Sequence, residues 1–436
     1  MEPQYRHWKR NVIMMVGSQI LVMTGFTAAM PFIPLYLKEG LWIINESDRG
    51  FYVSMFNLGG LLAYGLFNPI WGTLSDRFGV KPMLLRGTFL TCIFFPMMAY
   101  VGNVWLLVLL RFITAACAGT TVAAQTLLVK NTPENNQGLA LGMLTTAYWT
   151  GSMLGNVAGG LVVSYYGYTA AFWFCGILYF AAGLFVVYAK DDYIPAKAMP
   201  QKTHTVKKNR FHLPEFTSGV RLILLLTLLA GLAFSLEGPY ISMLIEQIVG
   251  IKRAAFWTGI ISSGAAVGSV IAGVVNGYLA DRVRPMRLLI PILVMTGIFL
   301  LIQATSPVFF KEPEVQWTLF GKSLTVNLNL LVFGVSRVLM LLTLGGSGAI
   351  FMKLLANSTP KRKRGSVFGF RSTAHCCGGM LASLIAGGII YLCGNVRSVF
   401  YGASLFVFLL IPLAVWIIRR VMAQPFYRAH SPFGKR

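Results

Sequence analysis

The chain has 436 residues, of which 56% are hydrophobic and 12% are charged. Because a soluble domain carries about 25% charged residues, this composition excludes a water-soluble globular protein and also a disordered or collagen-like chain. The formal net charge is +23, but the basic residues stand between long apolar runs, so they indicate membrane topology rather than nucleic-acid binding. The six cysteines are scattered in these runs without metal-ligand spacing, and we assign them to packing.

Long apolar segments follow one another along the whole chain. A bilayer core about 30 Å thick is crossed by roughly 20 such residues in a helix. The first segment is too long for a signal-peptide core and shows no convincing cleavage site, so we expect it to stay as a helix. The predicted spans are Val12–Leu37, Phe51–Trp71, Met83–Val101, Val104–Leu128, Gly138–Tyr165, Ala170–Tyr188, Ser218–Ile245, Ala255–Leu279, Met286–Ile302, Leu328–Leu355, Gly365–Leu392 and Ser398–Val421.

An even number of spans places both termini on one side of the membrane. Of the 37 Lys and Arg residues, 27 fall on that side and 7 on the other, and Arg111, Arg221 and Arg337 lie inside spans. This asymmetry predicts that both termini are cytoplasmic, in a multi-pass protein of the bacterial inner membrane.

Two connections are longer than the rest. Residues 191–216 are polar and basic, and we predict a cytoplasmic linker there, between an N-terminal six-helix bundle (1–190) and a C-terminal one (217–436). Residues 305–327 lie on the outer side. Their alternation around Gly321-Lys322 is compatible with a small β-hairpin or with an irregular loop.

The two halves resemble each other. Gly72-x-x-x-Asp76-Arg77 follows span two, and Gly277-x-x-x-Asp281-Arg282 follows span eight. Arg111 in span four is matched by Arg337 in span ten, with a slip of one residue. Six residues of span five recur 227 positions later in span eleven: Gly142, Thr146, Ala147, Gly151, Met153 and Leu154 match Gly369, Thr373, Ala374, Gly378, Met380 and Leu381. The common order predicts duplicated six-helix halves.

The stretch Gly72-Thr-Leu-Ser-Asp-Arg-Phe-Gly-Val-Lys81 resembles the signature loop of the major facilitator superfamily, with Val80 in place of one base. The likeness covers essentially the whole chain. It implies an all-α integral membrane protein with twelve transmembrane helices in two pseudo-symmetric six-helix bundles, the major facilitator fold.

Within that superfamily the chain is similar to the twelve-helix drug:proton antiporters. The likeness rests on Pro31–Tyr36, on Arg111, and on the run Gly151–Gly160, in which Asn156 stands where the antiporters have proline.

The signature loop suggests a gate. Its residues Gly72, Asp76, Arg77, Gly79 and Lys81 resemble a latch that joins the halves on the cytoplasmic side, with Gly277, Asp281 and Arg282 as its second-half counterpart. We expect Asp76 to cap a helix N-terminus, that of span eleven, while Arg77 and Lys81 face lipid phosphates or partner acids. The other interpretation is a turn that carries only topology-setting charges.

Span five offers a bare face. Gly151, Gly155, Gly159 and Gly160 are spaced so that a neighbouring helix can approach closely. Such a face suits a sliding gate contact, and it suits ordinary helix packing equally well.

Three ionisable residues inside spans are candidates for proton coupling. Arg111 lies about 10 Å inside span four, and the resemblance implies that it couples substrate and proton binding. Glu237 stands beside Gly238-Pro239, where we expect an interrupted helix, and a carboxyl there is able to exchange a proton or to attract a cationic substrate. His375 is a possible proton carrier. A structural arginine, an interfacial acid and a packing histidine are the respective alternatives.

Aromatic, amide and cationic side chains within the spans are candidates for a substrate cavity, since rings suit amphipathic ligands. Lipid-facing or packing roles remain open for them. The candidates are Gln19, Asn57, Tyr64, Gln125, Tyr148, Trp149 and Arg337.

Motifs of nucleotide-driven or metal-dependent enzymes are absent: Gly321-Lys322-Ser323 mimics the end of a P-loop, but Gln316 replaces its first glycine. We therefore predict no enzyme, cofactor, metal or nucleic-acid partner. The expected protein is a monomeric secondary transporter that works by alternating access among membrane lipids and exports amphipathic small molecules, multidrug-type, in exchange for protons. Alternatives are a proton-linked importer or uniporter of a metabolite such as a sugar or organic anion, and a non-transporting receptor or lipid flippase-like scaffold.

Overall fold

The computed structural model describes residues 7–190, 217–319, 322–359, 364–424 and 427. The predicted linker, 191–216, lies outside these residues. In the described part, eleven segments are long and apolar enough to cross a membrane.

The first half of the chain is helical throughout. Its helices are α1 (Trp8–Ala29), α2 (Ile33–Glu39), α3 (Glu46–Phe78), α4 (Val80–Met97), α5 (Val104–Cys117), α6 (Thr120–Asn131) and α7 (Glu134–Tyr188), with 3-10 turns η2 (Met30–Phe32) and η3 (Met98–Tyr100).

The second half repeats this pattern. It contains α8 (Ser218–Ser235), α9 (Ile241–Val249), α10 (Ile251–Arg282), α11 (Pro285–Thr305), α12 (Leu328–Leu344), α13 (Ser347–Asn357), α14 (Arg364–Cys393) and α15 (Arg397–Met422), with 3-10 turns η4 (Gly238–Tyr240) and η5 (Ser306–Val308).

The long helix α7 contains two spans. At 1.5 Å per residue its apolar part, 53 residues, would be about 80 Å long, which is more than twice a bilayer core. The backbone turns at Gly167, where φ is 81° and ψ is 176°. Gly155 before the turn and Cys175 after it lie against the neighbouring residues Thr24 and Gly25 of α1, so the chain folds back on itself. The predicted twelve-span fold is thereby confirmed.

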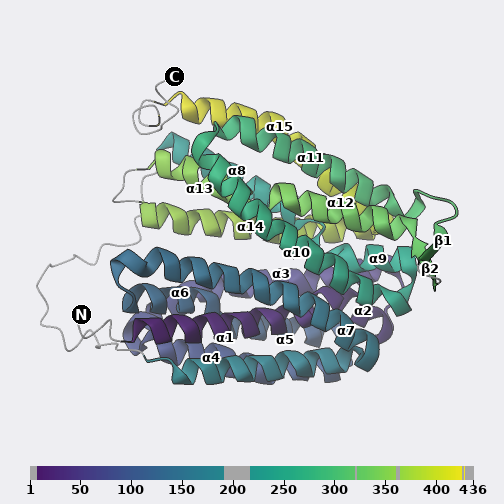
Figure 1. The fold of residues 1–436 in the computed structure, drawn as a ribbon, viewed down its shortest axis with the longest axis horizontal. Coiled ribbons are helices and arrows are strands. Elements are labelled where there is room, and N and C mark those ends of the chain that lie inside the picture. Colours follow the sequence, from purple (N-terminus) through teal and green to yellow (C-terminus); the bar gives the residue numbers. More distant parts are fainter. Residues whose placement is uncertain (1–6, 191–216, 320–321, 360–363, 425–426, 428–436) are drawn as a thin grey trace, which may run out of the picture.

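Figure 1 shows the spans as two groups, the first six below and the last six above. The groups touch through α7 with α10 and α3 with α14, which are spans five with eight and two with eleven. We call the end where α1 begins and α15 ends the terminal end, and the opposite end, which carries the strands, the hairpin end (Figure 1).

Four spans are interrupted in matching pairs. Span one breaks at η2, which contains Pro31, and span seven breaks at η4, which contains Pro239; the latter confirms the expected interruption. Proline interrupts a helix because it lacks the N–H donor and clashes with the preceding turn. Spans four and ten break at Gly119, with φ of 92°, and at Gly345-Gly346. The matching positions agree with the predicted duplication.

The connection between α11 and α12 contains a β-hairpin. Strands β1 (Glu314–Leu319) and β2 (Lys322–Asn327) pair in antiparallel register, with Glu314 opposite Asn327 and Leu319 opposite Lys322. This decides between the two structures that the sequence left open for 305–327. The hairpin leads directly into α12, since β2 ends at Asn327 and α12 begins at Leu328. Leu328 N–H donates to the carbonyl oxygen of Pro313 at 2.7 Å, which ties the start of α12 to the residue before β1.

Candidate functional site

The two halves meet backbone to backbone at the hairpin end. A Cβ atom on Gly160 of α7 would lie 3.0 Å from the Cα of Gly259 and from the carbonyl oxygen of Ala255, both on α10. Only glycine allows this approach. Gly151, Gly155 and Gly159, in contrast, pack on α1 within the first half. The glycine face of span five therefore serves ordinary packing at three positions and contact between the halves at the fourth.

A second contact joins α3 to α14 at the same end. Ser54 Oγ donates to the carbonyl oxygen of Ser383, and Asn57 Nδ2 donates to Ser383 Oγ at 2.8 Å. Nearer the hairpin end, Glu46 accepts hydrogen bonds from Gln247 Nε2 at 2.9 Å and from the backbone N–H of Val396. All these bonds connect the first half to the second.

A buried charged cluster lies across this end. Glu246 of α9 accepts from Arg49 Nη1 of α3 at 2.7 Å and forms a second ion pair with Lys38 of α2. Arg49 is 4% exposed and Glu246 7%, so water screens their attraction little. Sequence reasoning missed this cluster. The available signal was an acid just beyond the end of span seven and two cations on the predicted outer side, which carries few.

The halves separate toward the terminal end. Gly142 on α7 and Gly277 on α10 stand 18 residues from Gly160 and Gly259, five full turns, and therefore on the same faces of their helices. A Cβ atom at either position would have no heavy atom within 4 Å outside its own helical neighbourhood. The two helices thus touch at one end and face open space about 27 Å away along their axes.

A central cavity of about 440 Å³ lies between the halves below the closed end. The broken segments of spans one and seven contribute to its lining on opposite sides, with Met30, Pro31 and Pro34 from the first and Gly238 and Pro239 from the second. Interrupted helices beside a cavity between two bundles are typical of substrate sites in transporters. The polar side chains of the lining are Asn57, Arg111, Ser235, Ser262 and His375.

Arg111 is the one Lys or Arg residue in the described cavity lining, and this lining contains no Asp or Glu. The guanidinium carbon lies 5.2 Å and 5.6 Å from the ring centroids of Phe26 and Phe56. Its Nε packs on Gly60, where a Cβ atom would collide with it, and has no hydrogen-bond partner among the described residues. Aromatic faces stabilise the charge, which stays available to a ligand.

Glu237 and Arg337 form a buried ion pair behind the cavity. Arg337 Nη1 of α12 donates to Glu237 Oε1 at 2.7 Å, and both side chains are buried. Glu237 Oε2 has no hydrogen-bond partner in the described part of the chain. Glu237 directly precedes the Gly238-Pro239 segment of the cavity wall. Arg337 itself does not line the cavity, although we predicted it as a substrate-cavity residue from the sequence.

The other predicted residues are dispersed. Gln19 Nε2 donates to Thr121 Oγ1 at 3.2 Å inside the first half, Tyr148 packs edge-on against Trp149, Tyr64 is half-buried and Gln125 is exposed. None of these five residues belongs to the lining of the central cavity, whereas Asn57, Arg111 and His375 do.

The predicted gating loop is a sharp helix-to-helix turn. Helix α3 ends at Phe78, and Gly79, with φ of 95°, links it to α4, which begins at Val80. Lys81 Nζ donates to the carbonyl oxygens of Val187 and Ala189 at the end of α7, a favourable place for a cation. The side chains of Asp76, Arg77 and Asp281 lie outside the described part, and so does Gly72, so the latch stays a prediction. Arg282 lies over the ring of Tyr278 at 4.1 Å.

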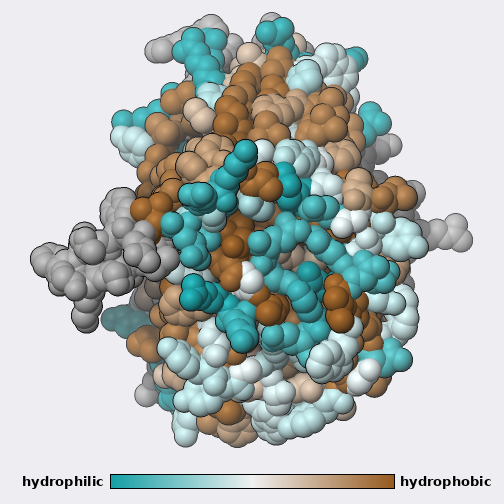
Figure 2. Space-filling view, turned by 90° about the vertical axis from the view of Figure 1, so that its right-hand side faces the viewer, coloured by the Kyte–Doolittle hydropathy of each residue, from teal (hydrophilic) through white to brown (hydrophobic). Residues whose placement is uncertain are grey.

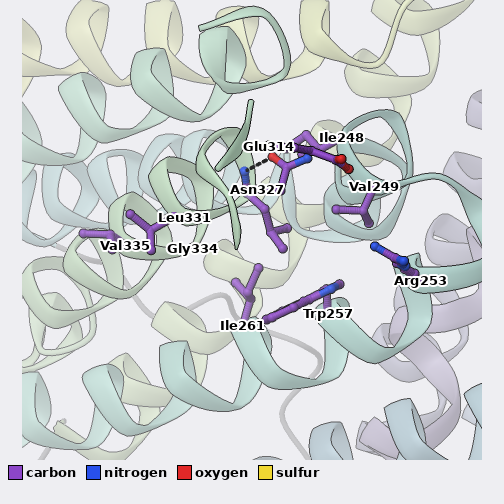
Figure 3. A pocket seen from close by; sticks show the side chains of 11 residues that line it. Ile248, Val249, Arg253, Trp257, Ile261, Glu314, Asn327, Leu331, Gly334 and Val335 are labelled. Atoms are coloured by element: carbon purple, nitrogen blue, oxygen red, sulfur yellow. Dashed lines mark hydrogen bonds between the residues drawn. The ribbon is translucent and has the colours of Figure 1, made fainter. Parts of the chain in front are cut away.

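A second cavity, of about 400 Å³, opens at the hairpin end of the second half (Figure 3). Figure 2, which views that end, shows hydrophilic residues across its middle with hydrophobic residues above and to the sides. No group of three or more His, Cys, Asp or Glu residues able to hold a metal ion occurs among the residues that the structure describes.

Repeated apolar spans, arranged around a cavity that is closed at one end, define a multi-pass membrane transporter of small molecules. The chain belongs to the major facilitator superfamily, whose sequence profile matches residues 15–320 and, in a second match, 223–430.

Two curated relatives come from bacteria. The multi-drug resistance efflux pump PmrA of Streptococcus pneumoniae is 28% identical over 415 residues, covering 92% of this chain and 94% of the relative. The multidrug resistance protein MdtG of Salmonella choleraesuis is 28% identical over 303 residues, covering 68% and 72%.

Solved transporters share the fold. The nucleoside transporter NupG superposes with a TM-score of 0.69 at 12% identity, over 95% of this chain and 99% of that chain. A bacterial homologue of the human lysosomal transporter Spinster, solved in an inward-facing and unoccupied conformation, gives 0.69 at 13% identity, over 98% and 97%.

Proposed function

We propose that the protein exports amphipathic small molecules across the bacterial inner membrane in exchange for protons, by alternating access. Two curated relatives named as multidrug efflux or resistance proteins support export. The single observation that carries the mechanism is the wedge between α7 and α10, in contact at Gly160 and Gly259 and apart at Gly142 and Gly277.

The excess of Lys and Arg at the terminal end supports a cytoplasmic location of that end and of both termini. The conformation is then the one that is open to the cytoplasm. Residues 1–190 and 217–436 act as two bundles that rock about the central cavity. One chain supplies both sides of this cavity, which favours a monomeric unit.

The Glu246 cluster is the outer gate in this proposal. Its ion pairs with Lys38 and Arg49 join α9 to α2 and α3, and they must separate before the cavity opens to the outside. The signature loop around Asp76 would close the cytoplasmic side in the alternate state, as the family resemblance implies.

Proton exchange is assigned to Glu237. A proton on its unpaired oxygen neutralises the carboxylate and removes the attraction to Arg337. This change occurs one residue from the broken segment of the cavity wall, so it is placed to alter the cavity. Arg111 would attract polar or negative parts of the substrate, with His375 opposite as a second titratable group.

A second candidate is proton-linked import of an organic anion. It is favoured by one observation, the unpaired guanidinium of Arg111 in a cavity lining that has no Asp or Glu among its described residues. The direction of transport separates the two candidates.

Inverted membrane vesicles with an imposed proton gradient test the first candidate. Adding an exported amphipathic compound should dissipate the gradient in vesicles of the wild type but not of Glu237→Gln or Arg111→Gln. Arg221→Gln, an exposed arginine at the start of α8, is the matched control and should behave as the wild type. A broad compound panel without any response, together with accumulation of a labelled organic anion in proteoliposomes, would replace export by import.

A further inference from the structure

The second cavity lies entirely within the second half. Its walls come from α9, α10 and α12 and from the two ends of the hairpin, Glu314 and Asn327, which pair in the register of the strands (Figure 3). It lies near the contacts that join the halves at the hairpin end, but none of its lining residues belongs to the lining of the central cavity.

Helix α10 presents different faces to the two neighbours. Arg253, Trp257 and Ile261 recur every four residues and line the second cavity. Ala255 and Gly259 lie on another face, where they contact α7 of the first half. A ligand in the second cavity would therefore bind to one bundle only, without bridging the halves.

The cavity is apolar inside and open along α12. Leu331 and Val335, one turn apart on α12, line it and are 53% and 51% exposed. Farther from the hairpin end the space between the helices closes, because Val338 packs against Gly264 and Gly268 of α10. Leu331 and Val335 therefore form an exposed apolar stripe that runs from the cavity along the surface of α12.

Two opposite charges stand at this cavity. Arg253 lies two residues after the start of α10, and Glu314 begins β1. Both are exposed, and neither forms an ion pair or a side-chain hydrogen bond with any residue that the structure describes. Trp257 is one turn deeper than Arg253. Tryptophan and arginine at a helix end are typical of the level of the lipid headgroups.

We propose that this cavity binds a glycerophospholipid with a zwitterionic headgroup, from the leaflet at the hairpin end. Arg253 binds the phosphate, Glu314 binds the ammonium group, and one acyl chain follows Leu331 and Val335. The two unpaired charges match the two charges of such a headgroup, and the exposed apolar stripe matches its chain. This site is independent of the direction and the coupling of transport.

Photolabelling tests the site on the full chain in lipid nanodiscs. The probe is phosphatidylethanolamine with a photoreactive group in one acyl chain, and the readout is the labelled peptide found by mass spectrometry. We expect labelling in the α12 peptide that contains Leu331 and Val335. Arg253→Gln and Glu314→Gln should each reduce this labelling about two- to five-fold, the upper part of the range for one exposed ion pair.

Three comparisons make the test decisive. Lys252→Gln removes the adjacent exposed cation, which does not line the cavity, and should leave labelling unchanged. Gly334→Leu fills the cavity from α12 and should abolish labelling, with thermal unfolding as the check that the variant is folded. A phosphatidylglycerol probe, which lacks the ammonium group, should label several-fold more weakly.

Equal labelling of Arg253→Gln and Lys252→Gln would overturn the proposal. So would equal labelling by the two lipids, or displacement of the probe by an exported compound at concentrations that saturate transport, since the cavity would then be a substrate site.

Discussion

Replacing Glu246 by Gln should open the hairpin end. The carboxylate holds Arg49 at 2.7 Å and also pairs with Lys38, and it joins the second half to two helices of the first. Arg49 and Glu246 are almost fully buried in the closed end, whereas separation of the halves would return them to water. The substitution therefore penalises the closed state and leaves the open state nearly unchanged.

The magnitude follows from burial. Removing one partner of a buried ion pair costs about 3–5 kcal/mol. Gln keeps an oxygen that accepts from Arg49, and the Lys38 side chain is 33% exposed, so its pair contributes at most about 1 kcal/mol. We take about 2–3 kcal/mol for the loss, and this shifts the closed-to-open ratio by about 30- to 150-fold.

Spin labels at Ile44 and Lys252 report this shift. Both positions are exposed at the hairpin end, one in each half, and the labels are attached in a variant without the native cysteines. The distance distribution of Glu246→Gln should gain a longer component that is minor in the parent. Glu312→Gln, an exposed acid at the same end, is the matched control. If Glu246→Gln and Glu312→Gln give the same distribution as the parent, the cluster does not hold this end closed.

Further predictions concern three other sites. Arg337→Met leaves the buried Glu237 carboxylate without its partner and should lower the free energy of unfolding in detergent by about 3–5 kcal/mol. Adding Glu237→Gln should restore most of this loss, and a double variant no more stable than Arg337→Met would contradict the pairing. Gly160→Leu should push α7 away from Gly259 and make the central cavity more accessible from the hairpin end. The measurement is labelling of the cavity by an impermeant thiol reagent added at that side, and unchanged labelling would contradict this prediction. Asp76→Asn should leave membrane insertion intact and reduce transport strongly, so a fully active Asp76→Asn protein would remove the latch interpretation.

Local patterns predicted the fold well. Apolar run lengths placed the spans, and the Gly238-Pro239 pair placed the break in span seven, because both depend on neighbours in sequence. The breaks in spans four and ten were missed, since the single residue Gly119 and the pair Gly345-Gly346 are ordinary in apolar helices and acquire meaning only through their conformation.

The site was predicted less completely, because its contacts join distant positions. Arg337 lies 100 residues from Glu237, and Glu246 lies 197 residues from Arg49, so the sequence offered the single residues as candidates or signals but did not show which residues pair. Arg111 was recognised because a charge inside an apolar span is costly and therefore informative. Gln125 looked equivalent as a polar residue in a span, yet it is exposed on α6, since helical periodicity alone does not tell which face meets the cavity.

Crosslinking the closed end tests the rocking of the halves most directly. Glu46 and Gln247 form a hydrogen bond across the halves, so cysteines at these two positions, in a variant without the native cysteines, are joined by a short bifunctional reagent that attaches to each thiol through a disulfide bond. A cysteine pair at Tyr100 and Trp173, which contact each other within the first half, is the control. The account predicts that the first crosslink abolishes transport until a reducing agent cleaves it, and that the control crosslink leaves transport intact. Undiminished solute flux in fully crosslinked Glu46→Cys/Gln247→Cys protein would contradict it.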